Sequence, residues 1–322
     1  MLDGFNSMAM HAFLDPFRAA NYLQSESYYQ WEYLGHDSET VTASNGLKVC
    51  DLASFANVQK QFDLLVVNSS WGVERFQDPT LLGRIRAAAT RGSAIGGIDT
   101  GAFVLAYAGL LKGKRAATHY EHIAAFRELF QDVKMDEDMF VIEGDCMTCC
   151  GGLAATDMAL EIIRLQHGIE LANAAARYIF HERLRTGQEG QLPEHQEPVG
   201  YSAPNVLREA IIAMERNLEQ PRTIGEICNG LNISERQLSR LFTRHTGVTP
   251  IRYYLDVRLD RARGLVTQTQ MSILDVAIAC GFTGAAQFSR AYRNRFSISP
   301  SQDRIEGRVP FQFRSFPSHA GV

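Results

Sequence analysis

The chain of 322 residues has no long run of apolar residues. A membrane-spanning helix needs about 18 of them in succession, and no stretch approaches that length. The first 13 residues also lack the basic start and the extended apolar core of a secretion signal. From these absences we predict a cytoplasmic protein without a membrane partner.

Cysteine is scarce as well, with 6 residues in the whole chain, two of them adjacent. This usage does not resemble the disulfide framework of a secreted protein. Cys146 and Cys149 form a CxxC pair, but no second CxxC or HxxxH accompanies it, and a structural zinc site needs four ligands. Metal or redox chemistry is the alternative. We predict structural thiols on a buried strand that runs into a Gly-Gly turn, with no metal and no cofactor.

Lysine is absent from residues 201–322, where all 16 basic side chains are arginines and face 10 acidic ones. Residues 1–200 instead carry 16 basic and 26 acidic side chains. The planar fork of arginine suits phosphate oxygens and guanine edges. A basic, lysine-free module joined to an acidic one is typical of a nucleic-acid binder fused to a second domain.

Two domains are also the expectation for a chain of this length. Residues 186–204 are polar, hold three prolines and three glycines, and show no helical or alternating apolar period, so we predict a linker there. This interpretation gives a first domain at 1–185, a second at 205–307 and a tail at 308–322.

Before the linker, short apolar runs alternate with amphipathic stretches, which favours an α/β domain with a parallel sheet flanked by helices. We expect strands at 31–34, 62–67 and 93–98, and helices at 79–91 and 102–111. After the linker, apolar residues recur at helical spacing and no strand pattern survives. The second domain is therefore predicted to be all-α.

The second domain contains an internal repeat. Residues 224–250 match residues 273–300 at an offset of 49, which becomes 50 within the second turn. Each copy has a short apolar helix, a tight break and a longer amphipathic helix. This is the plan of a helix-turn-helix motif, in which the second helix reads DNA.

The two reader helices differ in their outward faces. The first has Ser234 as its expected N-cap and a core stripe of Leu238, Leu241 and Phe242. The second begins with small residues, so we expect the first to read bases and the second to contact mostly phosphate. A long helix at 250–268 would hold both on one side of double-stranded DNA. The alternative for each arginine or glutamine is an ordinary solvated face. The predicted DNA-contacting residues are Ser234, Arg236, Gln237, Arg240, Arg244, Gln287, Arg290 and Arg293.

Several motifs of this domain resemble the AraC/XylS family of bacterial transcription regulators, from about residue 211 to residue 304. The family usually has an aromatic residue where this chain has Asp303, a departure expected to affect the last helix but not DNA reading. The motifs are Ile224-Gly-Glu-Ile-Cys, Gln237-Leu-Ser-Arg-Leu-Phe, Gly247-Val-Thr-Pro, Cys280-Gly-Phe, Phe288-Ser-Arg and Ser299-Pro.

In the first domain, Gly96-Gly-Ile-Asp-Thr-Gly-Ala ends a strand and opens a helix, a turn that often displays a nucleophile. Together with Ala117-Thr-His-Tyr and Cys150-Gly-Gly-Leu it resembles the glutamine-amidotransferase-like domain of the intracellular-protease type. The resemblance implies a flavodoxin-like fold. In the GlxA-like group of AraC regulators, this domain precedes the DNA-binding part, in the order found here.

Enzymes of this fold use a cysteine in the turn and a histidine that falls at His119, but this sequence has Asp99 in the place of the cysteine. A carboxylate cannot perform thiolate chemistry, so we favour a binding pocket without catalytic residues over an active site. A carboxylate beside aromatic rings suits an amine, an amino acid or a quaternary ammonium compound. Asp99 as a plain helix cap and His119 as an ordinary strand-end residue are the alternatives. The predicted pocket residues are Asn6, Asn45, Trp71, Asp99, Thr100, His119 and Tyr120.

The N-terminus departs from the same resemblance, because the family has an apolar strand before the equivalent of Gly4-Phe-Asn and only three residues precede it here. Either the strand is lost or the chain begins late.

These inferences combine into a DNA-binding transcription regulator, an activator by resemblance. The predicted partners are promoter DNA, a small nitrogenous effector, a second copy of the chain and RNA polymerase. An amidase-like or glyoxalase-like enzyme with a DNA-binding tail is the rival reading. A third possibility is a regulator whose first domain only dimerises.

Overall fold

The structure is a computed structural model that describes residues 1–36, 39–191 and 203–306. The chain divides into two compact units, with the boundary between residues 191 and 192. No helix in the described part is long and apolar enough to cross a membrane.

The first unit is built on a four-stranded sheet in the order β5-β6-β10-β9. β5 (Leu64–Ser69), β6 (Ala94–Asp99) and β10 (Cys146–Cys149) run parallel, whereas β9 (Phe140–Glu143) is antiparallel to β10. The predicted strands at 62–67 and 93–98 are therefore confirmed within two residues. The sheet is mixed rather than wholly parallel, because Gly144, with φ of 60°, begins the tight connection that turns β9 back alongside β10.

The predicted strand at 31–34 is wrong over most of its length. Only Leu34 of this run lies in a strand, the two-residue β1 (Leu34–Gly35), which pairs with β4 (Ala53–Ser54). The side chains of Trp31 and Tyr33 are 38% and 40% exposed. The apolar run therefore reflects aromatic residues near the surface and not a buried central strand.

Two further strand pairs are equally short. They are β2 (Val41–Thr42) with β3 (Lys48–Val49), and β7 (Arg115–Ala116) with β8 (Lys134–Met135).

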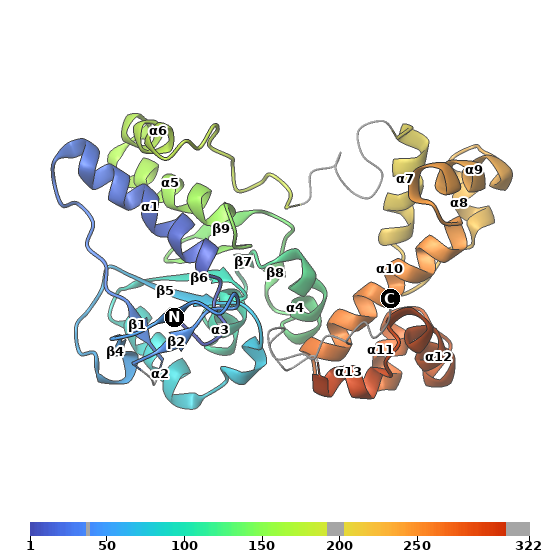
Figure 1. The fold of residues 1–322 in the computed structure, drawn as a ribbon, viewed down its shortest axis with the longest axis horizontal. Coiled ribbons are helices and arrows are strands. Elements are labelled where there is room, and N and C mark those ends of the chain that lie inside the picture. The colour runs from blue at the N-terminus through green and yellow to red at the C-terminus, as the bar shows by residue number, and fades with distance from the viewer. Residues whose placement is uncertain (37–38, 192–202, 307–322) are drawn as a thin grey trace, which may run out of the picture. The chain divides into compact units, whose positions relative to one another are not determined.

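Helices cover both faces of the sheet (Figure 1). On one face lie α1 (Ser7–Gln24), α5 (Ala154–His167) and α6 (Ile169–Tyr178), whose apolar sides form one core with the buried side chains of β6 and β10. On the other lie α2 (Pro79–Thr90) and α3 (Gly101–Tyr107). The helix predicted at 79–91 is confirmed, and the one predicted at 102–111 ends four residues early, before Gly109, whose φ is 75°. The short α4 (Ile123–Leu129) follows β7.

The first residues of the predicted linker are bonded to this unit. The backbone oxygen of Gly187 accepts from Met139, and the side chain of Gln191 donates to the backbone oxygens of Thr118 and Asp138. Residues 192–202 of the predicted linker and residues 308–322 of the predicted tail lie outside the described residues.

The second unit is helical in all its described elements, as predicted. α10 (Pro250–Gln268) runs from the first helix-turn-helix pair, α8 (Ile224–Gly230) and α9 (Glu235–Thr246), to the second pair (Figure 1). The second pair is α11 (Ile273–Ala279) and α12 (Ala285–Phe296). The long helix predicted at 250–268 is confirmed with these bounds. The helices are α7 (Asn205–Glu215), α8 (Ile224–Gly230), α9 (Glu235–Thr246), α10 (Pro250–Gln268), α11 (Ile273–Ala279), α12 (Ala285–Phe296) and α13 (Pro300–Glu306).

The turn of the second motif is tied to the rest of the unit. Arg258 on α10 donates to the backbone oxygens of Cys280 and Gly281 and lies over the ring of Phe282 at 4.4 Å. Gly281 has a φ of 72°, and a Cβ there would lie 2.4 Å from the ring of Pro221, before α8. Only glycine fits this contact, which packs the two halves of the unit against each other.

Candidate DNA interface and ligand site

The first reader helix, α9, begins with a complete capping box. The Ser234 hydroxyl accepts from the backbone of Gln237, and the Gln237 side-chain oxygen accepts from the backbone of Ser234 at 2.9 Å. Ser234 is therefore the N-cap, as predicted. Leu238 and Phe242 are fully buried and Leu241 partly, which confirms the core stripe. The buried stripe leaves the opposite face of α9 to solvent.

Three arginines occupy that solvent face. Arg236, Arg240 and Arg244 are exposed, and none forms an ion pair with another described residue. Gln237 is exposed too, but its oxygen is occupied by the capping box, so only its NH₂ group remains to donate to a base or a phosphate. The face is basic and its guanidinium groups are available to an anion.

The second reader helix, α12, starts differently. Its N-cap is Gly284, without a side-chain cap, and the oxygen of Gln287 instead accepts from the backbone and hydroxyl of Thr283. Arg290 and Arg293 are exposed and form no ion pair within the described residues. The start of α12 is therefore poor in free polar side chains, as predicted, while its later turns carry two cations.

Other arginines of this unit have structural partners, which distinguishes them from those on the readers. Arg252 pairs with Asp256 and Arg295 pairs with Asp256 and Asp260. Arg304 donates to the backbone oxygens of Val266 and Met271. Their positive charges are already neutralised or hydrogen-bonded, so they hold helices together.

Asp303 belongs to this structural set. It is 2% exposed, and its carboxylate accepts from the guanidinium of Arg263 and, at 2.7 Å, from the hydroxyl of Tyr292. The carboxylate thus joins α13 to α10 and α12. The sequence marked Asp303 as a departure affecting the last helix, but gave no sign of its two partners.

In the first unit, Asp99 ends β6 in the left-handed region, with φ of 61°. Two residues further on, position 101 must be glycine, because a Cβ on Gly101 would lie 2.4 Å from the backbone oxygen of Val67. The turn therefore has the sharp geometry that the sequence predicts, with the Asp99 carboxylate at the position where the resemblance implies a thiol.

The Asp99 carboxylate is 3% exposed and hydrogen-bonded. Asn6 donates to it at 2.8 Å, and the Ser70 side chain is a second hydrogen-bond partner. Burial raises the pKa of Asp99 to about 6, opposed by Asn6 and by the nearby His119. A cation brought next to this carboxylate would lower the pKa again, so the site favours positive charge.

Asp99 does not cap the helix that follows, because the N-cap of α3 is Thr100 and no side chain caps it. Thr100 is itself fully buried: its hydroxyl donates to the backbone of Ser70 at 2.7 Å and lies 3.0 Å from the Ser69 hydroxyl. Thr100 therefore anchors the turn, and its hydroxyl is already engaged.

His119 and Tyr120 lie on the more exposed side of the site. Their rings are 4.5 Å apart, and Tyr120 is 46% exposed. His119 is not a plain strand end, since its Nδ1 caps the short helical turn that follows. His119, Glu121 and His122 have possible metal-ligating atoms within 4.8 Å of one another. These are three ligands, whereas a structural zinc site has four.

The remaining predicted pocket residues lie around the start of α1. Asn6 caps α1 through its side-chain oxygen, and Asn45 donates to the hydroxyl of the next residue, Ser7. Trp71, two residues beyond the end of β5, has its backbone oxygen beside Gly4 and its side chain 38% exposed. The structure therefore gathers the seven residues around the carboxyl ends of β5 and β6 and the first turn of α1.

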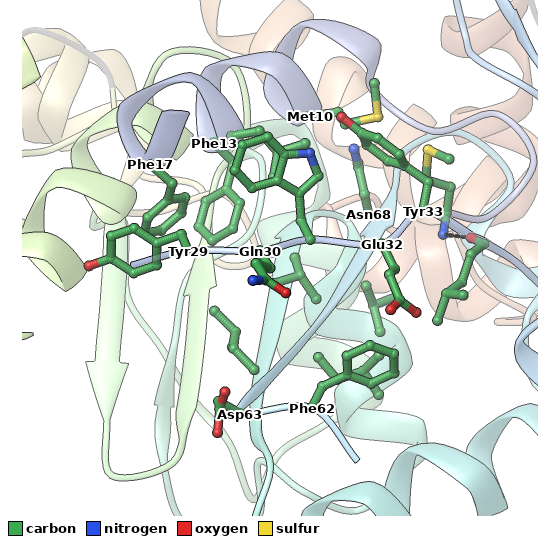
Figure 2. Close-up of a pocket in the computed structure, with 18 of the residues that line it drawn as sticks. Met10, Phe13, Phe17, Tyr29, Gln30, Glu32, Tyr33, Phe62, Asp63 and Asn68 are labelled. Atoms are coloured by element: carbon green, nitrogen blue, oxygen red, sulfur yellow. Dashed lines mark hydrogen bonds between the residues drawn. The ribbon is translucent and has the colours of Figure 1, made fainter. Parts of the chain in front are cut away.

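Sequence reasoning missed a cavity of about 570 Å³, which none of these seven residues lines. Figure 2 shows Met10, Phe13 and Phe17 of α1 on one side of it and Phe62 and Asp63, just before β5, on the other. The aromatic-rich run at 28–33 also lines the cavity, and this run was the available signal. Its last three residues, 31–33, fall within the strand predicted at 31–34.

The CxxC cysteines lie on a buried strand as predicted, and all six cysteines of the chain are unpaired thiols. Burial raises the pKa of Cys150, beside Asp99, to about 12. Burial raises the pKa of Cys149 further still. Thiols in such a setting are poor nucleophiles. Their arrangement supports the structural interpretation.

Comparison with known proteins agrees with both halves. The chain matches the helix-turn-helix domain family over residues 227–305 and the DJ-1/PfpI family over residues 6–165. It is 38% identical to the HTH-type transcriptional regulator CdhR of Pseudomonas aeruginosa over 304 residues, 94% of this chain and 90% of that protein. It is 32% identical to the HTH-type transcriptional regulator GlxA of Rhizobium meliloti, with 94% of each covered.

A solved AraC family transcriptional regulator from Pseudomonas putida shares the fold, with a TM-score of 0.50 at 24% identity, over 55% of this chain and 96% of that one. The descriptions of these relatives and the two matched families confirm the two resemblances found in the sequence. The chain therefore belongs to the AraC-type transcriptional regulators of the GlxA-like group, which join a DJ-1/PfpI domain to a helix-turn-helix domain.

Proposed function

We propose that this protein is a transcription activator whose affinity for promoter DNA depends on a small cationic metabolite bound beside Asp99. The observation behind the ligand is the buried carboxylate itself, held at the turn between β6 and α3, with His119 nearby and the ring of Tyr120 4.5 Å from that of His119. A carboxylate with aromatic neighbours attracts an amine, an amino acid or a quaternary ammonium group through charge pairing and cation–π contact.

The DNA contacts that we propose divide by helix. On α9, Arg236, Arg240 and Arg244 read base edges, with Ser234 and the NH₂ group of Gln237 at the helix start. On α12, Gln287, Arg290 and Arg293 contact mainly phosphate. Exposure and the lack of an ion pair for these arginines within the described residues support this role. α10 spans 19 residues, about 28 Å at 1.5 Å per residue, close to the roughly 34 Å between successive major grooves.

The first unit serves, in this proposal, as a sensor without catalysis. A carboxylate lacks the nucleophilicity of a thiolate, and the nearby Cys150 has a pKa raised to about 12 by burial. The rival is an amidase-like or glyoxalase-like enzyme. Turnover of an amide or aldehyde substrate that Asp99→Ala abolishes would establish the enzyme and refute the sensor.

The ligand proposal is tested by thermal shift with amines, betaines and amino acids. A compound that binds only the folded state raises the melting temperature. The expected result is a shift in the natural protein that Asp99→Asn loses. Asp51→Asn is the matched control, because Asp51 is exposed and also has a left-handed φ, of 58°. Failure of every compound would leave the first unit as a dimerisation domain and contradict the sensor.

Three partners complete the proposal. The first unit pairs with a second copy of the chain, so that two DNA-binding units meet one operator. The activator contacts RNA polymerase, and both events take place in the bacterial cytoplasm. Size-exclusion chromatography with light scattering, and run-off transcription with and without ligand, test these steps. A monomer at all concentrations, or transcription that falls on addition of protein, would refute them.

A further inference from the structure

Residues 181–191, here called the strap, lead from the end of α6 to the boundary between the two units. The strap contains no helix, and its pairing with the rest of the described chain is limited to one isolated antiparallel bridge, between Gly190 and Asp138. The second unit begins at residue 192, so the chain that joins the units passes through the strap.

A buried carboxylate anchors the first half of the strap. Asp157 of α5 has a fully buried side chain, and its carboxylate lies 2.8 Å from Nε2 of His181. The same carboxylate accepts from the backbone nitrogen of Arg185 at 3.1 Å and from its guanidinium at 2.9 Å. Release of this half would leave a buried charge without its cation, which is costly. Residues 181–185 therefore belong to the fixed part of the first unit.

The second half of the strap is held by its backbone. Met139, just before β9, donates its N–H to the backbone oxygens of Gly187 at 3.0 Å and Glu189 at 3.1 Å. A Cβ on Gly187 would lie 2.4 Å from the backbone oxygen of Phe140, so only glycine allows this approach. Hydrogen bonds between uncharged groups are weaker than those to the Asp157 carboxylate. Residues 186–191 are thus the half that can leave the body of the unit.

Gln191 joins this half to the turn at Asp99. Its side-chain nitrogen donates to the backbone oxygens of Thr118 at 2.8 Å and Asp138 at 3.0 Å. The hydroxyl of the fully buried Thr118 donates to the backbone oxygen of Asp99 at 2.8 Å. The side-chain oxygen of Gln191 is buried without a hydrogen-bond partner among the described residues, a cost that release would remove. The strap therefore ends two hydrogen bonds from Asp99 and is held there at a cost.

A second connection runs along the backbone of residues 150 and 151. Gly151 packs on the Asp99 side chain, since a Cβ at Gly151 would lie 2.9 Å from the Cβ of Asp99. The nitrogen of Cys150 donates to the backbone oxygen of Met139 at 2.9 Å, and the nitrogen of Met139 donates to the strap. Two separate chains of contacts thus lead from Asp99 to residues 186–191.

We propose that residues 186–191 are the output of the Asp99 site: a ligand bound there holds this half of the strap on the first unit, and loss of the ligand releases it. This inference rests on the ligand-sensing function proposed above, in which the ligand contacts His119, next to Thr118. A ligand that binds only while this segment is in place raises the cost of releasing the strap. By linkage, release of the strap weakens ligand binding by the same factor.

Release changes the length of the connection between the units. It frees residues 186–191, which extend by up to about 20 Å at about 3.4 Å per residue. In a dimer, a longer connection lowers the effective concentration of the second DNA-binding unit at its half-site. A ligand that keeps the strap docked therefore favours operators whose half-sites lie close together.

Hydrogen exchange at single amides tests the docking of the strap. The Met139 amide reports it directly, and Ile95, whose N–H donates to the backbone oxygen of Asp145, is the reference for general loss of stability. We expect Gln191→Leu to speed exchange at Met139 by about tenfold or more and to leave Ile95 unchanged. Gln188→Leu is the matched control, because Gln188 is exposed in the same strap and its side chain forms no hydrogen bond within the described residues. Equal exchange in the two variants would overturn the docking.

The connection to Asp99 is tested without any ligand. Thr118→Val removes the hydroxyl that bonds to Asp99 but keeps the backbone oxygen that bonds to the strap. We expect exchange at Met139 to rise about fivefold. Thr118→Ser retains a hydroxyl and should exchange as the natural protein does. No change in the valine variant, or the same change in both variants, would refute the connection.

A final comparison uses tetramethylammonium chloride as the ligand probe, with sodium chloride at the same concentration as the salt control. Tetramethylammonium should slow exchange at Met139 in the natural protein and have no effect in Asp99→Asn. If it raises the melting temperature but leaves Met139 unchanged, the strap is not the output of the site. If it does not bind, the proposed ligand function loses this compound, and the Thr118 variants alone decide on the strap.

Discussion

The amide of Asn6 joins two functions in one side chain: its nitrogen donates to the Asp99 carboxylate at 2.8 Å, while its oxygen caps α1 at 3.0 Å. The first turn of α1 is therefore tied to the turn between β6 and α3. Any change in the charge or hydrogen bonding of Asp99 acts directly on the start of α1, which packs on α5 and α6.

The first prediction concerns the cost of this buried carboxylate. Burial raises the pKa of Asp99 to about 6 from an unfolded value of 3.8. Between these values the folded protein holds a proton that the unfolded chain has released, so the free energy of unfolding falls as pH rises from about 4 to 6. Asp99→Asn should remove this loss and stabilise the protein at pH 7 by roughly 1–3 kcal/mol.

Urea denaturation of both proteins between pH 4 and 7 measures this difference. Asparagine tolerates the left-handed φ of residue 99, so the substitution adds little backbone strain. Curves for the natural protein and the variant that stay parallel across the range would show that the carboxylate is not destabilised by burial.

The second prediction tests the reading face of α9. Arg236→Ala or Arg240→Ala should weaken specific operator binding by roughly 1–3 kcal/mol. Arg252→Ala is the control, because Arg252 is also an exposed arginine but pairs with Asp256 on α10. Gel-shift titration at one fixed salt concentration measures the three affinities. If Arg252→Ala weakens binding as much as the reader variants do, the face is misassigned.

The third prediction separates the two roles of Ser234. Ser234→Ala removes the N-cap and should lower the free energy of unfolding by about 1 kcal/mol. Ser234→Asp keeps a capping oxygen but adds a negative charge at the proposed DNA surface. We expect the aspartate variant to retain stability and lose DNA affinity, as measured by denaturation and gel shift. Unchanged affinity would place Ser234 outside the interface.

The fourth prediction concerns the thiols. In the folded protein Cys50 is exposed, Cys149 is fully buried, and burial raises the pKa of Cys150 to about 12. Ellman's reagent at pH 8 should therefore label Cys50 rapidly and the other two only after unfolding. Cys50→Ser should abolish the fast phase. Rapid labelling of Cys149 or Cys150 would revive a redox role for the CxxC strand.

Features encoded by neighbours in the sequence were predictable. The capping box of α9 spans the four residues from Ser234 to Gln237, the stripe of Leu238 and Phe242 follows helical spacing, and the sequence predicted the bounds of α10 to the residue. The turn at Asp99 was also found from local glycines. Each of these depends on contacts within a few residues, which the chain carries whatever its fold.

Features made by distant segments were not predictable. The cavity combines residues of α1, α2, α5 and β5 with the run at 28–33, and no local pattern shows that these segments meet. The strand prediction at 31–34 was wrong for the same reason. A strand forms only when another strand pairs with it, and the hydrophobicity of a segment does not show whether such a partner exists. Asp303 and Arg263 are 40 residues apart, so their pairing appears only in the structure.

The last prediction follows from that pair. The Asp303 side chain is buried, so removing its cation leaves a charge without compensation, which costs about 3 kcal/mol. Partial exposure of Arg263 will lessen the effect. Arg263→Ala should therefore destabilise the second unit, and Tyr292→Phe, which removes one hydrogen bond to the same carboxylate, should cost about 1 kcal/mol. Hydrogen exchange of α10 and α13, with β6 and β10 as the internal reference, measures both. If the two variants lost the same free energy of unfolding, the Arg263 guanidinium would stabilise the Asp303 carboxylate no more than the Tyr292 hydroxyl does.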